Sequence, residues 1–199
     1  MKIRIMSWAL LVVFTALCLG AVETLWTQER LAEKTVRLHV VANSDSDDDQ
    51  AQKLAVRDAV LPVIAALTED CKSARQAREV LSAHLPEISA AAESASGGRP
   101  VQATLTDEAF PTRYYDTFTL PAGTYPSLRI RIGAAQGHNW WCVVFPSLCA
   151  AATSDALEQY AAVGGFDEAE TDLITGGEET YHIRFKAFEW LQALINFLT

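Results

Sequence analysis

The side chain best suited to nucleophilic chemistry in this sequence is the thiol of Cys142, which follows His138 by four residues. A catalytic thiol needs a base within hydrogen-bonding distance and an electropositive surround. On an extended strand, two residues at this spacing lie more than about 10 Å apart, at about 3.3 Å per residue. His39, His84 or His182 could serve as the base only if the fold brought it near. A cysteine-dependent hydrolase is therefore one hypothesis, and a buried cysteine that only packs is the other.

A run of acidic residues from Asp45 to Asp49 could bind a cation. A calcium loop of the EF-hand type that started at Asp45 would need glycine at its sixth position and glutamate at its twelfth. This chain has Gln50 and Val56 there. Ser46 can instead cap a helix whose first turn is acidic. We interpret the run as a helix start, and we predict no metal, no cofactor and no catalytic group of residues.

The composition predicts one folded domain. The chain has 199 residues, half of them hydrophobic, and a formal net charge of −9. A hydrophobic fraction of this size can form a core. An acidic surface lacks the basic stripe that binds phosphates, so the charge argues against nucleic acid and against electrostatic binding to anionic lipid.

The first residues have the pattern of a targeting segment. Lys2 and Arg4 precede Ile5–Val22, which carries no charge. Such a run is long for a signal peptide and just long enough to span a bilayer. We therefore predict export, with residues 1–22 as a cleaved signal peptide or an uncleaved membrane anchor. Residues 23–34 are predicted to be a helical or flexible linker, and residues 35–199 the domain.

Three cysteines follow the apolar segment, namely Cys71, Cys142 and Cys149. An exported protein can form disulfides, and Cys142 and Cys149 are the natural pair. The alternative is three buried free thiols. No C-x-x-C spacing indicates a zinc site.

The hydrophobic periodicity predicts an α+β fold with a mixed or antiparallel sheet of about five strands. A strand is predicted at Thr35–Ala42. A helix is predicted from Ser46 toward Leu67, which Pro62 should kink or split. A second helix is predicted from Ser73 to about Ala95, with a possible break at Pro86.

The second half of the chain is predicted to be rich in strands. The expected strands are Val101–Thr106, Ser127–Gly133, Trp140–Phe145 and Tyr181–Lys186. The Trp140–Phe145 strand is apolar on both faces, which predicts a place in the middle of a covered sheet. The acidic segment Thr153–Thr180 is expected to be a surface excursion, and Ala187–Leu198 an amphipathic C-terminal helix.

Adjacent tryptophans raise a separate question, because neighbouring residues on a strand face opposite sides. Either both rings pack in the core, or one of them is an anchor on a binding surface. We expect Trp141 to be buried and Trp140 to lie nearer the surface.

Several stretches of the sequence resemble one protein family. They are HVVANSDSDDDQ (His39–Gln50), KLAVRDAVL (Lys53–Leu61), FPTR (Phe110–Arg113), LPAGTY (Leu120–Tyr125), GHNWWCVVFPSLC (Gly137–Cys149) and the closing pair Phe185 and Lys186. With these, the chain resembles stage II sporulation protein R of endospore-forming Firmicutes. The resemblance covers most of the chain from about Val36 to Cys149.

The resemblance implies a function. Members of this family are understood as signals that are made in the forespore and exported into the space between the forespore and mother-cell membranes. There they activate a membrane-bound aspartic protease of the mother cell, which cleaves the precursor of sigma-E. The resemblance implies no enzymatic activity. The candidate partner-binding residues taken from the matching motifs are Asn43, Ser44, Asp45, Arg57, Phe110, Arg113, Tyr125, Asn139 and Trp140.

Overall fold

A computed structural model describes residue 15, residue 20, residues 22–148 and residues 154–175. Cys149, the predicted Tyr181–Lys186 strand, the predicted Ala187–Leu198 helix and nearly all of the Ile5–Val22 segment lie outside the described residues. Within the described residues, no helix is long and apolar enough to cross a membrane.

The centre of the fold is a four-stranded sheet with the order β2-β5-β1-β6. The strands are β1 (Val36–Val41), β2 (Val101–Phe110), β5 (Gly123–Ile132) and β6 (Asn139–Phe145). The β1–β5 pair is parallel, and the β1–β6 and β2–β5 pairs are antiparallel. A small second sheet pairs β3 (Arg113–Tyr114) with β4 (Thr119–Leu120). The predicted α+β class is confirmed; the main sheet has four strands among the described residues, and the fifth predicted strand, Tyr181–Lys186, lies outside them.

Among the described strands, β6, which was predicted for the middle of the sheet, lies at its edge. β6 has only β1 as a neighbour among the described strands. Its residues are nevertheless buried on both faces, because Cys142 and Val144 pack in one hydrophobic core and Val143 packs in another. The apolar run on both faces of β6 is explained by the packed layers above and below the strand.

The helix after β1 is α2 (Asp47–Thr68), and it begins as predicted. The Ser46 hydroxyl accepts a hydrogen bond from the Asp49 main-chain N–H. The prediction that Pro62 kinks or splits this helix is wrong in one respect, because the helix continues through Pro62 without a break. Proline leaves the carbonyl of residue i−4 without a donor. Asp58, which carries that carbonyl, is exposed, so water can supply the missing hydrogen bond.

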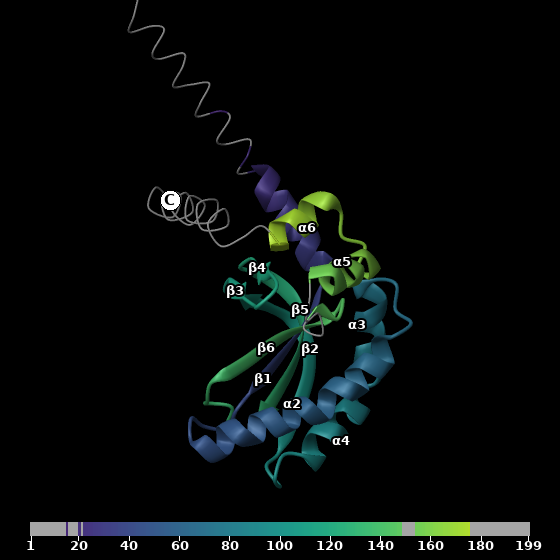
Figure 1. Cartoon of the computed structure of the whole chain (residues 1–199). Helices are drawn as coiled ribbons and strands as arrows, with labels where there is room; N and C mark the ends of the chain where they lie inside the picture. Colours follow the sequence, from purple (N-terminus) through teal and green to yellow (C-terminus); the bar gives the residue numbers. More distant parts are fainter. Residues whose placement is uncertain (1–14, 16–19, 21, 149–153, 176–199) are drawn as a thin grey trace, which may run out of the picture.

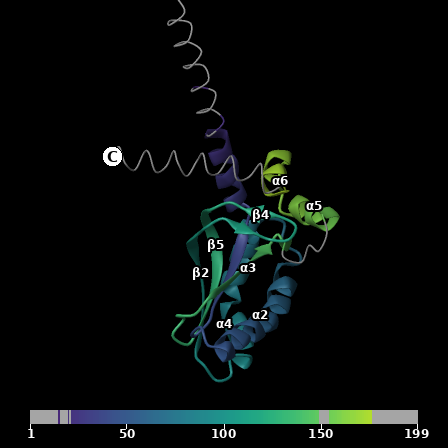
Figure 2. The ribbon, with the colours of Figure 1, turned by 60° about the vertical axis from the view of Figure 1, so that its left-hand side comes forward.

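The second predicted helix is divided into α3 (Ala74–Ala83) and α4 (Leu85–Ser94). The division falls at His84, and Pro86 lies in the first turn of α4. Main-chain N–H groups in a first turn have no acceptor within the helix, so a proline there costs no hydrogen bond. Helices α2, α3 and α4 cover one face of the sheet, as Figures 1 and 2 show. The main core lies between them and the sheet; its largest fully buried members include Leu38, Ile64, Leu81, Ile88, Leu128, Ile130 and Ile132.

A second layer covers one end of the opposite face. It contains a helical segment at residues 22–33, α5 (Ser154–Val163), α6 (Glu168–Thr175) and the β3–β4 pair (Figure 1). The expected surface excursion after Thr153 is thus helical and packed: Leu157, Leu173 and Ile174 belong to the second core. The fully buried carboxylate of Glu170 pairs with Lys34 at 2.6 Å and with Arg30 at 3.4 Å. These contacts join the N-terminal helical segment to α6.

Candidate functional site

The connection from β5 to β6 crosses the end of β1, because β1 lies between these two strands in the sheet. At the crossing, the Gln136 and Gly137 N–H groups donate to the carbonyls of Asn43 (3.1 Å) and Ala42 (3.0 Å). The Ala134 N–H donates to the side-chain oxygen of Asn43 at 2.9 Å. Residues 42–49 and 133–140, called the crossing corner below, are thereby joined. Two stretches that carry the family resemblance therefore meet in one place.

Two glycines make this close approach possible. A Cβ at Gly137 would lie 2.1 Å from the Ser44 carbonyl oxygen, and a Cβ at Gly133 would lie 2.2 Å from the Asn43 side-chain oxygen. Real Cβ atoms do not approach so closely. Gly133 also has a φ of +55°, which side chains disfavour. A side chain at position 137 would therefore require a shifted backbone, and one at position 133 would have to displace the Asn43 side chain and adopt a strained φ.

Asp49 connects the corner to the start of α2. Its buried carboxylate accepts hydrogen bonds from the Ser44 hydroxyl and, at 2.7 Å, from the Asn43 amide, and it pairs with Arg99. The hydrogen bond from Ser44, then that from Asn43, hold the pKa of Asp49 below its ordinary value. Asn43 and Ser44 were predicted as partner-binding residues, and the structure turns both side chains inward onto Asp49.

Asp45 and His138 form the exposed part of the corner. The Asp45 carboxylate accepts hydrogen bonds from the main-chain N–H of His138 and from its imidazole Nδ1–H. Their side chains are 55% and 78% exposed, so a partner could reach both. The Lys53 ammonium, on α2, donates a hydrogen bond to the His138 carbonyl at 3.1 Å. Burial lowers the pKa of Lys53.

Arg57 and Trp140 lie beside this pair. The Arg57 guanidinium is 5.2 Å from the Trp140 ring centroid, a distance typical of a cation–π contact. Trp140 is half-buried against the main core. Together with Asp45 and His138, these two residues define what we call the corner surface. It offers an aromatic ring, both signs of charge and an imidazole.

The remaining candidate residues lie elsewhere. Phe110 and Tyr125 are buried in the second core with ring centroids 6.0 Å apart, so neither is placed to contact a partner in this structure. The Tyr125 hydroxyl donates to the Pro121 carbonyl at 2.8 Å, and burial raises the pKa of this hydroxyl. Arg113 stacks on Trp141 at 3.5 Å, on the sheet face opposite α2.

Asn139 belongs to a polar network on that same face. His39 contacts the Glu108 carboxylate through Nδ1 and the Asn139 side-chain oxygen through Nε2, both at 2.8 Å. Arg129 lies 3.6 Å from the same Glu108 oxygen. Sequence reasoning did not place Glu108 or Arg129 in a site. The alternation of Arg129 with apolar neighbours predicted that it lies on the face of the strand opposite to those neighbours. Its partner Glu108 could not be predicted, because Glu108 lies on β2, whose pairing register the sequence does not specify.

Cys142 does not form the catalytic pair that the hydrolase hypothesis requires. It is 1% exposed and disulfide-bonded, so it presents no thiolate. His39 is paired with Trp141 across β1 and β6, and it faces the side of the sheet opposite to Cys142. Cys71 is a buried free thiol. Because Cys149 lies outside the described residues, its pairing with Cys142 stays a prediction.

Trp140 and Trp141 are both half-buried, so the expected difference in their burial is absent. Trp140 packs on the main core and Trp141 on the second core. We expect alanine at either position to lower the free energy of unfolding by about 1–3 kcal/mol, less than the full cost for a buried ring. Only Trp140→Ala should reduce partner activation beyond its loss of folded protein. Thermal melts of both variants, paired with an activation assay, check this; equal ratios of activity to folded protein would contradict it.

The fold and the corner define a small α+β domain that presents polar and aromatic groups on a hydrogen-bonded turn. The chain belongs to the stage II sporulation protein R family, whose model matches residues 32–155. Stage II sporulation protein R of Bacillus subtilis (strain 168) is 39% identical over 123 residues, which are 60% of this chain and 55% of that relative. The chain thus matches little more than half the length of this relative. No solved structure matches the chain.

Proposed function

We propose that this chain is an exported signalling protein of endospore formation that activates a membrane-embedded aspartic protease of the mother cell. Activation of the protease leads to processing of the sigma-E precursor. The observation that carries the proposal is the family match over residues 32–155, which contain all four strands of the main sheet and the whole crossing corner. The family is named for a stage of sporulation and not for a reaction.

The proposed place of action is the space between the forespore and mother-cell membranes. The uncharged segment Ile5–Val22, with Lys2 and Arg4 before it, has the composition of an export signal or an anchor. The chain would cross the forespore membrane and then either be released or stay attached to it. Its acidic charge is consistent with a protein partner, and neither nucleic acid nor a cofactor has a role in the proposal.

The proposed mechanism is differential binding. A signal activates a receptor only if it binds the active state more tightly than the inactive state. The corner surface supplies groups suited to such binding: the Trp140 ring is an apolar anchor, and Arg57 and Asp45 are charges of opposite sign. Arg57 and Trp140 lie on α2 and β6, and the turn that carries Asp45 is held by hydrogen bonds from Asn43 and Ser44 to Asp49. These groups are therefore ordered before the partner arrives.

Reconstitution tests the proposal. The full-length chain is co-expressed with the protease and the sigma-E precursor, and precursor cleavage is measured. Arg57→Glu, which reverses a charge of the corner surface, should reduce cleavage about tenfold or more, because aromatic and arginine anchors dominate binding energy. Arg131→Glu is the matched control, since Arg131 is exposed on the other face of the sheet. No cleavage with the wild-type chain would overturn the proposed function.

Export should be required for activity. A chain that lacks residues 1–22 should accumulate inside the cell that makes it and should not activate a protease in the neighbouring compartment. We expect loss of precursor cleavage in the mother cell while the amount of truncated protein stays comparable. The measurement is an immunoblot of the precursor in sporulating cells that express either form. Cleavage at the wild-type level by the truncated, retained chain would show that the segment is not needed.

A further inference from the structure

Four buried hydrogen-bond donors lie on the sheet face opposite α2 without acceptors. They are Nε and Nη1 of Arg37, Nε of Arg113 and the Ser127 hydroxyl, and none of them has a hydrogen-bond partner in the part of the chain that the structure describes. Arg37 and Ser127 are opposite each other on the parallel strands β1 and β5, so their side chains project from the same face. Both residues are 0% exposed.

Tyr115 connects the two arginines. It follows Arg113 by two residues, and its hydroxyl accepts a hydrogen bond from Arg37 Nη2 at 2.9 Å. Burial raises the pKa of Tyr115, and the charges of Arg37 and Arg113 both act in the opposite direction. Burial, and to a smaller extent the charge of Arg113, lowers the pKa of Arg37. The two guanidinium groups therefore lie close enough together to repel each other.

Positive charge exceeds negative charge on this face. Glu108 is the one acidic residue that the four described strands of the main sheet place there, and its Oε1 already contacts His39 at 2.8 Å and Arg129 at 3.6 Å. No ion pair among the described residues includes Arg37 or Arg113. The local charge thus has the opposite sign to the net charge of the chain, which is −9.

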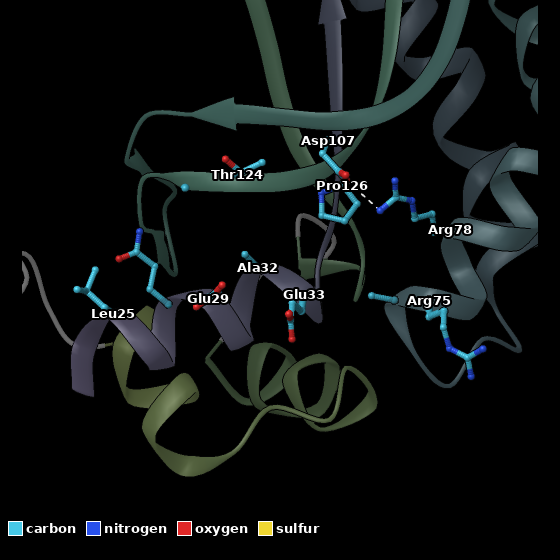
Figure 3. A pocket seen from close by; sticks show the side chains of 12 residues that line it. Leu25, Glu29, Ala32, Glu33, Arg75, Arg78, Asp107, Thr124 and Pro126 are labelled. Carbon is cyan, nitrogen blue, oxygen red and sulfur yellow. Dashed lines mark ion pairs between the residues drawn. The ribbon is translucent and has the colours of Figure 1, made fainter. Parts of the chain in front are cut away.

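A cleft of about 880 Å³ near the ends of β2 and β5 shows a different balance (Figure 3). Arg78 pairs there with Asp107 at 2.9 Å, and Glu29 and Glu33 line the same cleft. The other cation of its lining, Arg75, has an 86% exposed side chain that water can hydrate. The charges of this cleft are matched within the protein or hydrated, so the cleft gives no reason to expect an anionic ligand.

A carboxylate matches the unpaired donors in charge and in geometry. Its two oxygens accept hydrogen bonds from a guanidinium in a planar, bidentate arrangement. Arg113 and Tyr115 are half-buried, so an anion approaches from the β3–β4 side, while Arg37 and Ser127 close the inner end. A water molecule could accept some of these hydrogen bonds, but it carries no charge to offset the burial of a guanidinium.

We propose that Arg37, Arg113 and Ser127 form a binding site for one carboxylate group. The carboxylate accepts hydrogen bonds from both guanidinium groups and from the Ser127 hydroxyl, and it supplies the counter-charge for Arg37. Two sources offer this chemistry, namely a small free carboxylate and an acidic side chain of the protein partner. Only the second source rests on the proposed function.

Thermal unfolding of the full-length chain, purified in mild detergent, tests the site directly. The probe is sodium acetate, compared with sodium chloride at equal ionic strength so that general screening is the same in both. At a tenfold excess over its dissociation constant, acetate should raise the melting temperature of the wild-type chain by about 3–6 °C. Arg113→Gln and Arg37→Met should not respond. Arg75→Gln, which removes an exposed charge elsewhere, is the matched control and should respond like the wild type.

An acetate response that only the two site variants lack supports the inference. No acetate response of the wild-type chain overturns it, and so does an equal response in the two site variants. If Arg113→Gln does not fold, Arg113→Lys decides, because lysine keeps the charge without the planar fork. A wild-type response in that variant overturns the inference.

The chain's own acidic residues beyond Thr175 are tested in the same way. The double variant Glu178→Gln and Glu179→Gln removes two of their carboxylates and should respond like the wild type. A response that only this double variant shows would assign the site to the chain's own carboxylates and overturn an external ligand.

Precursor cleavage separates the two sources. The full-length variants are co-expressed with the protease and the sigma-E precursor, at equal amounts of folded chain. A loss of about tenfold with Arg113→Gln, but not with Arg75→Gln, would assign the carboxylate to the protein partner, because arginine anchors dominate binding energy. Cleavage at the wild-type level would assign it to a small free carboxylate. No cleavage with the wild-type chain overturns the proposed function and leaves the acetate result, and with it the site, unaffected.

Discussion

Gly137→Ala is expected to disrupt the crossing corner and to abolish the proposed activation of the protease. The added Cβ would lie 2.1 Å from the Ser44 carbonyl oxygen and 2.9 Å from the Ala42 Cβ. The first of these atoms belongs to the backbone, so a side-chain rotation cannot relieve the contact. Overpacking of this kind costs about 1–3 kcal/mol and sometimes more. The displaced turn would also lose the hydrogen bond from the Gly137 N–H to the Ala42 carbonyl.

Urea unfolding of the exported chain and the cleavage assay together measure this effect. Gly98→Asn is the matched control, because Gly98 has a φ of +81° and a Cβ there would meet no atom within 4 Å, and asparagine tolerates left-handed conformations. The control should change stability little. A Gly137→Ala variant as stable as the parent would show that the corner is able to move, and the corner would then not be a preordered binding surface.

Arg37→Met is expected to stabilise the fold. The Arg37 side chain is 0% exposed, and no ion pair among the described residues includes it. Its guanidinium lies 3.9 Å from the Phe110 ring centroid and donates one hydrogen bond, at 2.9 Å, to the Tyr115 hydroxyl. Its Nε and Nη1 have no hydrogen-bond partner in the part of the chain that the structure describes. Burial lowers the pKa of Arg37, which means that the environment disfavours its charge.

The magnitudes favour methionine at this position. Burying one ion costs several kcal/mol and leaves two N–H groups of Arg37 unpaired, whereas its cation–π contacts with Phe110 and, at the longer distance of 5.2 Å, with Tyr125 return at most about 2 kcal/mol each. We therefore expect the free energy of unfolding to rise by about 1–3 kcal/mol, at every pH at which the fold persists, because arginine does not lose its proton. Leu38→Ala, on the adjacent residue that faces the main core, should lower it by about 2–5 kcal/mol.

Equilibrium unfolding of both variants checks the contrast. A loss of stability in Arg37→Met comparable to that in Leu38→Ala would show that the guanidinium has a compensating anionic partner. A stabilised variant that no longer supports precursor cleavage would show instead that the charge is retained for activity at a cost in stability.

Local patterns predicted the elements well. Three element boundaries were predicted from nearby residues alone and were confirmed within a few residues. They are the start of β1 after Thr35, the start of α2 at the Ser46 cap and the end of β6 before Pro146. The possible break predicted at Pro86 falls two residues earlier, at His84, because proline favours the first turn of a helix. Pro62 was misjudged because the effect of a proline depends on whether its orphaned carbonyl reaches water, which is a property of the assembled fold.

The site was less predictable because its contacts join distant parts of the chain. Asn43, Ser44 and Asp45 were selected from their motif, but their inward or outward orientation depends on the connection near residue 137. Phe110 and Tyr125 were predicted to bind a partner, but both are core residues. Their residue type could not separate the two roles, because aromatic rings occur both in cores and at interfaces. The Glu108 contacts depend on the β2 register, which no local pattern specifies.

The position of β1 between β5 and β6 also has a consequence for assembly. β1 is made early, and its partners lie about ninety residues further along, for example Arg37 opposite Ser127. Closing so long a loop carries an entropic cost, and folds dominated by such non-local contacts fold slowly. α2, α3 and α4 can form during that delay, whereas the sheet cannot be completed before β6 has emerged. A chain that crosses a membrane from its N-terminus, as proposed here, could thus not complete this sheet until residue 145 of its 199 residues has crossed.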